Sequence, residues 1–278
     1  MPYTTLKILI IFIFFFFLLK IINVKYIIVS LTSYPPRIKS VVLTLQSLLN
    51  QTLKPNIIIL WLAHSEFPNK DHDLPKNLIE LKRKGIKIEY YDKNIKSYKK
   101  LIPTLEIYPN DIIITVDDDI IYENDTIKKL FKNYMKYPKD IHAHRVSKFI
   151  YYSRKFQRII GGYDYYNSSS FLNLPTGVGS VLYPPNCFYK DILNKSLFMK
   201  LAPTNDDQWF WIQGILNNIK VRVVNNPNIK INYISNTQNV ALFKKNKKLF
   251  WKDFKKLLSY YPRVKTILIK EYRRRKTK

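Results

Sequence analysis

Two clusters of aspartates are the residues of this sequence whose type and spacing could best do chemistry. The first cluster, Asp117, Asp118 and Asp119, directly follows an apolar run over 111–116. Three carboxylates at the end of a buried strand need a positive counter-charge. Mg²⁺ and Mn²⁺ favour carboxylate oxygens, and either ion could bridge such a triplet to a diphosphate. A solvated acidic turn, or the cap of a helix over 123–135, explains the same residues without a metal.

The second cluster, Asp206 and Asp207, opens an apolar segment over 205–217 that is predicted to be a helix. Helix capping accounts for one carboxylate, because Asn205 or Asp206 can accept hydrogen bonds from the free amides of the first turn. Capping does not require both, nor the indole of Trp209 beside them. A carboxylate next to an aromatic ring suits a base that acts on a sugar, since the ring stacks on the sugar's apolar face. Taken alone, the pair is better explained as a capped core helix.

Weaker candidates surround these clusters. Gly177 and Gly179 share one loop in a chain with only six glycines, and they would let the backbone approach a ligand closely. The pattern is not G-x-G-x-x-G, so it does not predict a dinucleotide site. Lys99 and Lys100 precede the acidic strand and could reach a phosphate. His142 and His144 lack further ligands at zinc spacing. They are interpreted as structural residues or as residues on the acceptor side of the site.

A parallel sheet would position these residues. Apolar runs over 26–31, 56–62, 86–91 and 111–116 alternate with segments of helical spacing. That alternation predicts parallel strands joined by right-handed crossovers. Ligands of such sheets bind beyond the carboxyl ends of the strands. The segments that follow the four runs should therefore meet in one site: 32–34, 63–66, 92–94 and 117–119.

Composition limits the classes of protein. The chain has 278 residues with 46% hydrophobic residues, enough for a sizeable core, which excludes a disordered chain. The single Cys187 excludes a disulfide framework and a cysteine-based zinc or iron–sulfur site. A net charge of +27 should attract nucleic acid, anionic lipid or phosphorylated substrates. A coding bias towards lysine explains the charge equally well.

The two ends of the chain suggest a membrane. Twelve apolar residues over 8–19 are flanked by Lys7 and Lys20 without a cleavage site, which favours a signal anchor in 1–24 over an interfacial segment. The positive-inside tendency then places a catalytic domain, 25–240, in the cytoplasm. The tail, 241–278, is predicted to be a basic amphipathic helix. Its apolar face would lie either on a membrane surface or on the catalytic domain.

The order of the motifs resembles the family-2-like glycosyltransferases with the GT-A fold, the type found in bacterial capsule and lipopolysaccharide loci. The motifs lie within 27–217: Ser-Leu-Thr-Ser-Tyr-Pro-Pro-Arg-Ile, Lys-Lys-Leu-Ile-Pro-Thr-Leu, Thr-Val-Asp-Asp-Asp-Ile-Ile-Tyr, a Gly-x-Gly loop before Leu-Tyr-Pro-Pro, and Asn-Asp-Asp-Gln-Trp. The resemblance implies a Rossmann-like, mostly parallel α/β sheet flanked by helices. It also implies a nucleotide-sugar donor and a divalent metal held by a D-x-D motif.

The resemblance also implies roles, residue by residue. Asp119 with Asp117 would hold Mn²⁺ or Mg²⁺, and Asp206 or Asp207 would be the base that deprotonates the acceptor. The remaining implied residues fall into a donor group and an acceptor group: Thr32, Ser33, Tyr34, Asp92, Lys99, Lys100, Asp117 and Asp118 for the donor, and Gly177, Gly179 and Trp209 for the acceptor. One departure is Ala63-His64-Ser65-Glu66, where many family members carry an acidic pair, which weakens any inference about base recognition. No Q-x-x-R-W motif follows Asp207, so a processive polymerase is not expected.

The predicted function is metal-dependent transfer of a sugar from a nucleotide-diphosphate sugar to a hydroxyl of a glycan or glycolipid, with inversion. One alternative is a haloacid-dehalogenase-like phosphatase, whose D-x-D-x-[TV] motif belongs on the first strand. Here the triplet follows the fourth predicted strand, and position 121 is Ile. Another alternative is a membrane-tethered protein that binds anions or nucleic acid without catalysis. No helix-turn-helix, zinc-finger or RNP-type signature supports it, so no specific nucleic-acid partner is expected.

Overall fold

The computed structural model describes residues 25–160, 169–224, 231–235, 237 and 243–276. Its centre is an eight-stranded mixed sheet with the order β3-β2-β1-β4-β11-β6-β12-β9. The four strands of its first half run parallel: β1 (Ile27–Thr32), β2 (Ile57–Ala63), β3 (Ile86–Tyr91) and β4 (Ile112–Thr115). The predicted α/β architecture with a mostly parallel sheet is confirmed.

The second half of the sheet changes direction. Strand β11 (Val181–Tyr183) is antiparallel to both β4 and β6 (Ile141–Ala143), β12 (Val221–Val223) runs parallel to β6, and β9 (Ser169–Ser170) closes the edge. Two smaller sheets accompany it. One contains β10 (Asn173–Pro175), β7 (Val146–Tyr152) and β8 (Lys155–Ile160), and the other pairs β13 (Asn232–Tyr233) with β5 (Ile120–Ile121).

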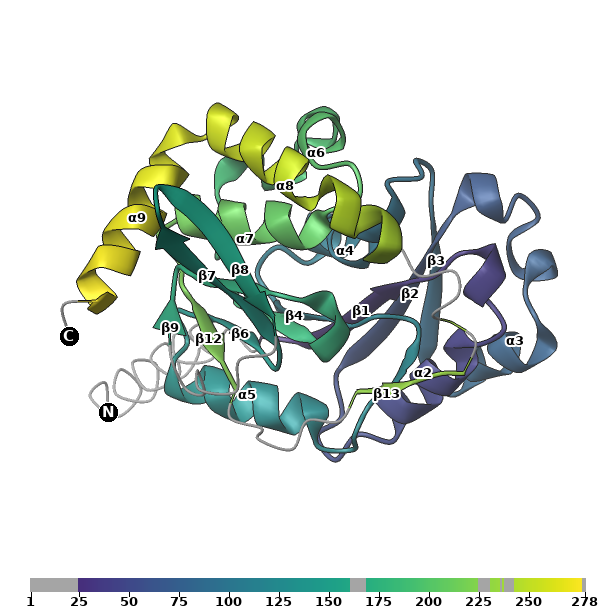
Figure 1. Ribbon diagram of the computed structural model, residues 1–278. Coiled ribbons are helices and arrows are strands. Elements are labelled where there is room, and N and C mark those ends of the chain that lie inside the picture. Colours follow the sequence, from purple (N-terminus) through teal and green to yellow (C-terminus); the bar gives the residue numbers. More distant parts are fainter. Residues whose placement is uncertain (1–24, 161–168, 225–230, 236, 238–242, 277–278) are drawn as a thin grey trace, which may run out of the picture.

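Helices cover both faces of the central sheet (Figure 1). The strands β1, β2 and β4 are mostly apolar and almost entirely buried because both faces of the sheet are covered, as is usual for parallel sheets. One face packs on α2 (Val41–Leu49), α3 (Lys76–Arg83) and α5 (Thr126–Lys136). The other packs on α4 (Ile102–Ile107), α6 (Lys195–Leu201) and α7 (Asp206–Leu216). Short 3-10 helices lie in the connections: η1 (Pro35–Arg37), η2 (His64–Glu66), η3 (Lys70–Asp73), η4 (Lys96–Lys100), η6 (Gly177–Gly179) and η7 (Lys190–Leu193).

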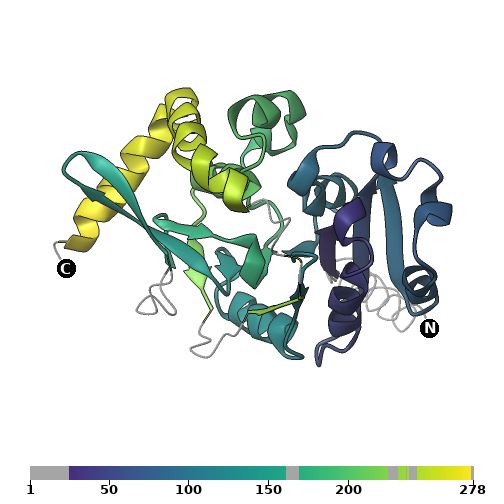
Figure 2. The ribbon, with the colours of Figure 1, turned by 45° about the vertical axis from the view of Figure 1, so that its right-hand side comes forward.

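The basic C-terminal segment forms two helices, α8 (Phe243–Tyr260) and α9 (Pro262–Lys276), which lie alongside the hairpin of β7 and β8 (Figure 2). The apolar side chains on one face of each helix, Phe254 and Leu268 among them, are buried in the same core cluster as α7, whereas Trp251 is 39% exposed. The Asn205 side-chain amide donates a hydrogen bond to Asp253 at 2.6 Å. The apolar face of the predicted tail therefore packs on the domain. Binding of this face to a membrane surface, the other interpretation of the tail, required the same side chains to be exposed.

The membrane location predicted from the sequence is contradicted. Within the described ranges, every helix is too short or too polar to cross a bilayer. The expected anchor itself, 1–24, lies outside the described residues.

Candidate active site

A cavity of about 730 Å³ opens at the carboxyl ends of β1 and β4. The segments after these two strands, 32–34 and 116–119, line it together with η4, the Gly177 loop and the start of α7. The sequence therefore predicted correctly that these loops converge. Asp92 does not line the cavity; Asn94, two residues later, does.

Arg37 supplies the counter-charge for two of the three aspartates that follow β4. Its Nη1 lies 2.7 Å from Oδ1 of Asp118 and 3.1 Å from Oδ2 of Asp119, and all three side chains are about nine-tenths buried. Ser33 donates a further hydrogen bond to Asp118 at 2.6 Å. Burial raises the pKa of Asp118 although Arg37 and Ser33 oppose the shift. Sequence reasoning missed Arg37, although it follows directly from the Pro-Pro turn after β1.

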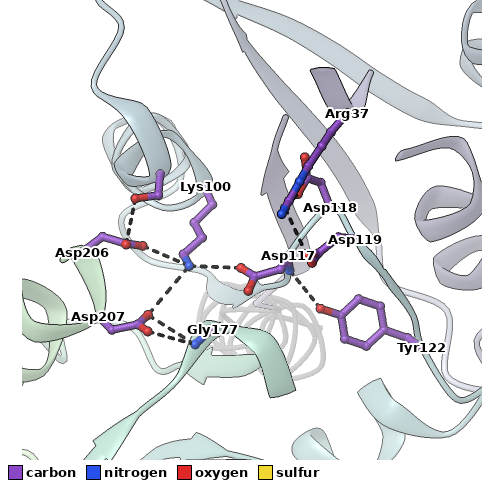
Figure 3. A network of polar contacts seen from close by, with 10 residues as sticks. Arg37, Lys100, Asp117, Asp118, Asp119, Tyr122, Gly177, Asp206 and Asp207 are labelled. Atoms are coloured by element: carbon purple, nitrogen blue, oxygen red, sulfur yellow. Dashed lines mark hydrogen bonds and ion pairs between the residues drawn. The ribbon is translucent and has the colours of Figure 1, made fainter. Parts of the chain in front are cut away.

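Lys100 joins the two aspartate clusters (Figure 3). Its Nζ lies 3.2 Å from Asp117, 3.0 Å from Asp206 and 3.8 Å from Asp207. Burial alone would lower the pKa of Lys100, but the three carboxylates outweigh it and raise that pKa well above its usual value. The lysine is therefore a fixed positive charge between residues that lie about ninety positions apart in the sequence.

Asp207 is the member of the acidic pair that faces the cavity. Its side chain is 33% exposed, against 8% for Asp206. The amide of Gly177 donates to both of its carboxylate oxygens at 3.3 Å. Burial raises the pKa of Asp207 to about 7; Asp206 and Asp117 add to the shift, whereas Lys100 opposes it.

Asp206 has a different environment. The hydroxyl of Ser97 donates to its Oδ1 at 2.8 Å, and Lys100 lies against its other oxygen. Asn205, the residue at the N-cap position, makes no capping hydrogen bond with its side chain. Simple helix capping therefore does not explain why two aspartates open α7, and ion pairing with Lys100 does.

The Gly177 loop lies so close to these charges that a side chain does not fit. A Cβ at position 177 would collide with Nζ of Lys100 and lie 3.0 Å from Oδ1 of Asp117. A Cβ at position 179 would lie 2.8 Å from Cβ of Arg145. Both glycines are needed for close approach, as the sequence suggested, and the partners in that approach are side chains of the protein.

The predicted role of Trp209 needs correction. Trp209 is completely buried, packs against Phe198 and donates its indole N–H to the carbonyl of Ile192 at 3.1 Å. It cannot stack on a sugar from that position and is a core residue. His142 and His144 are also buried away from the cavity, each bonded through Nε2 to a backbone carbonyl, and burial lowers the pKa of each to about 4.

The implied metal ligands, Asp117 and Asp119, turn towards different cations of the protein. Asp117 contacts Lys100, whereas Asp119 contacts Arg37 and is 8% exposed. Across the residues that the structure describes, no three His, Cys, Asp or Glu side chains are grouped to hold a metal ion. The chemistry of the site still fits a cation, because the five aspartates of the two clusters share two ion-pair partners, Arg37 and Lys100. Asp117, 28% exposed to the cavity, fits as a ligand, and Asp119 does not.

Further cations line the cavity, and the sequence predicted one of them, Lys99, as a phosphate contact. Lys99 is buried, donates to Asn94 at 2.9 Å and lies 3.8 Å from Glu66; burial lowers its pKa. Arg145 and Arg158 come from the irregular second half of the chain, where no sequence pattern marked them.

No family model matches the sequence, and neither does any curated protein. Among solved structures, S. aureus TarS 1-349 in complex with UDP is similar at 14% identity, with a TM-score of 0.49, 74% of this chain covered and 59% of that chain. The 4-diphosphocytidyl-2C-methyl-D-erythritol synthase of Anaerococcus prevotii DSM 20548 is similar at 17% identity, with a TM-score of 0.48, 78% of this chain covered and 95% of that one. This chain spans about 60% of the TarS 1-349 chain. At these scores the similarities support no argument about activity.

Proposed function

We propose that the protein is a glycosyltransferase that moves a sugar from a nucleotide-diphosphate sugar to a hydroxyl of a glycan or glycolipid acceptor. The observation that carries the proposal is Asp207: a carboxylate with a pKa of about 7, open to a cavity of about 730 Å³ at the carboxyl ends of parallel strands. The order of sequence motifs that resembles the family-2-like enzymes supports the same reaction.

Asp207 would act as the general base. A base works best when its pKa lies near the working pH, because it is then both available and strong enough to take a proton. The carboxylate of Asp207 is oriented by the Gly177 amide, so one oxygen can accept the proton of an acceptor hydroxyl while the other stays bound. A base that activates the acceptor directly suits a single displacement with inversion at the sugar carbon.

The leaving nucleoside diphosphate needs positive charge. The cations that line the cavity can supply this charge. Lys99 is one of them, and its carboxylate partner, Glu66, is 3.8 Å away. The five aspartates of the site outnumber Arg37 and Lys100, with which they pair. This part of the cavity would therefore repel a diphosphate unless protons or a further cation neutralise the excess negative charge. A divalent Mn²⁺ or Mg²⁺, when bound at Asp117 together with the diphosphate, would supply that counter-charge.

A donor screen with two matched variants tests the proposal. Purified protein is mixed with Mn²⁺ or Mg²⁺ and a panel of nucleotide sugars, and release of nucleoside diphosphate is measured. The Asp207→Asn variant should lose at least ~10²-fold in rate, the usual contribution of a positioned base, while it keeps nucleotide affinity. The Asp206→Asn variant should lose stability more than rate, since Asp206 is held by Ser97 and Lys100. Full activity of Asp207→Asn, or no release from any donor by the wild-type protein, would overturn the proposal.

A further inference from the structure

The cavity lining carries two arginines that form no ion pair with a carboxylate of the described residues. Arg145 and Arg158 line the cavity, and within the described part of the chain neither has a carboxylate oxygen within ion-pair distance. This distinguishes them from Arg37, Lys99 and Lys100, each of which contacts at least one. In addition, Nε of Arg158 is buried without a hydrogen-bond partner among the described residues.

The fold holds both arginines in place. The guanidinium of Arg158 lies over the ring of Phe250 at 4.3 Å from its centre, a cation–π contact that joins the β8 strand to α8. The carbonyl of Arg145 accepts hydrogen bonds from the amide and the hydroxyl of Thr176, and the missing side chain of Gly179 leaves room for its Cβ. The contact with Phe250 thus positions the guanidinium of Arg158, and the Thr176 and Gly179 contacts position the backbone from which the Arg145 side chain starts.

The two arginines line the same cavity as the proposed base. The charges of Asp207 and Arg145 both act on Arg158. Two guanidinium groups repel each other, so placing them together inside a cavity is unfavourable unless an anion binds between them. The planar guanidinium fork matches the oxygens of a phosphate or a carboxylate, which makes an oxyanion the fitting ligand.

We propose that Arg145 and Arg158 form a subsite for an oxyanion of the acceptor, a phosphate or carboxylate group close to the hydroxyl that reacts. The assignment to the acceptor rests on the proposed function, because it follows from the arginines lining the same cavity as Asp207, whose charge acts on Arg158. The segments that would hold the donor, 32–34 and η4, supply other residues to the lining. The diphosphate of the donor is the other possible source of an oxyanion, and the experiment separates the two.

The experiment measures binding of inorganic phosphate to the full chain by calorimetry, with and without a saturating nucleoside diphosphate. The variants Arg158→Gln and Arg145→Gln are compared with Arg154→Gln, which makes the same charge change at an exposed position of the same hairpin, outside the cavity. We expect wild-type and Arg154→Gln proteins to bind phosphate equally, also when the nucleotide is present. We expect about tenfold weaker binding for each cavity variant, since each loses a hydrogen bond between charged groups.

Two results would overturn the proposal. If the nucleoside diphosphate displaces phosphate and itself binds more weakly to Arg158→Gln, the arginines serve the donor. If the cavity variants bind phosphate as well as Arg154→Gln does, the arginines form no oxyanion subsite. Arg158→Lys keeps the charge and the contact with Phe250, so it should retain part of the binding even if Arg158→Gln folds poorly. Failure to bind any nucleotide would count against the glycosyltransferase proposal alone, since phosphate binding is measured independently.

Discussion

Replacing Lys100 with methionine tests the central claim about the electrostatics of this site. Methionine keeps an unbranched side chain of similar length and removes only the ammonium group. The charge it removes lies within 3.8 Å of three carboxylates, two of them within 3.2 Å. The variant would therefore leave Asp117, Asp206 and Asp207 facing one another without a cation.

The expected loss of stability is large. Removing one partner of a buried ion pair lowers the free energy of unfolding by about 3–5 kcal/mol, because the other charge stays buried and unpaired. Asp117 and Asp207 are 28% and 33% exposed, so solvent screens part of the repulsion and the lower end applies, about 3 kcal/mol at pH 8. This is a large part of the roughly 5–15 kcal/mol by which a folded domain is usually stable.

The loss should depend on pH in one direction. Without Lys100 the pKa of Asp207, already raised to about 7, rises further above the unfolded value of about 3.9. A carboxyl group whose folded pKa is raised destabilises the fold as pH rises above the unfolded pKa, because the unfolded chain releases the proton more easily. The difference between wild type and variant should therefore be largest at pH 8 and become smaller towards pH 4.

Lys99 offers a matched control one residue away. Lys99 is buried like Lys100, but its one carboxylate partner among the described residues, Glu66, lies 3.8 Å away. Burial therefore lowers the pKa of Lys99, whereas three nearby carboxylates raise the pKa of Lys100. The Lys99→Met variant removes a charge whose burial is poorly compensated, so it should change the free energy of unfolding by no more than about 1 kcal/mol.

Urea unfolding followed by tryptophan fluorescence, at pH 8 and pH 5, measures all three proteins. Equal losses for the two lysine variants would refute the reasoning, because burial alone would then explain the effect. A loss in Lys100→Met that is the same at both pH values would also refute it, since unpaired carboxylates must respond to protons.

Three further predictions follow from the same contacts. A methyl group at position 177 would collide with Lys100, so Gly177→Ala should lower kcat at least ~10-fold with little change in KM, measured on the donor that the screen identifies. Burial lowers the pKa of His142 and of His144 to about 4, below the unfolded value of about 6.5. The free energy of unfolding should therefore be highest above pH 6.5 and fall as the pH drops towards 4. Urea unfolding across that range should show a smaller change of this free energy with pH in His144→Asn than in the wild-type protein. Chelation with EDTA should stop transfer and Mn²⁺ or Mg²⁺ should restore it, whereas a full rate in chelator would mean that the protein's own cations suffice.

The first half of the fold could be read from the sequence because its strands are continuous apolar runs between helical segments. Parallel strands that are buried on both faces leave that pattern, and their carboxyl ends fix where the following loops meet. The convergence of 32–34 with 117–119 was predictable for this reason. The second half was not, since short strands such as β11 and β12 contain three residues each, too few to show a period.

The partners of the charged residues could not be read from the sequence. The contact between Lys100 and Asp206 depends on how η4 packs against the start of α7, and no spacing in the chain encodes it. The same holds for Arg158, which reaches the cavity only because β8 packs against Phe250. Trp209 was misjudged because an indole beside a carboxylate suits a sugar site and a core equally, and only burial distinguishes them.

Burial divides the five carboxylates of the site into two groups, and this division revises the roles that the sequence suggested. Asp118, Asp119 and Asp206 have side chains about 8% exposed, and each is paired with Arg37 or Lys100. Asp117 and Asp207 have exposures of 28% and 33% and face the cavity. Chemistry on a bound substrate requires access, so under the proposed function the contact with donor and cation would fall to Asp117 and the proton transfer to Asp207. The three buried carboxylates hold the two cations in place: Asp118 and Asp119 pair with Arg37, and Asp206 pairs with Lys100. Burial raises the pKa of Asp207, Asp206 adds to that shift, and Lys100 opposes it.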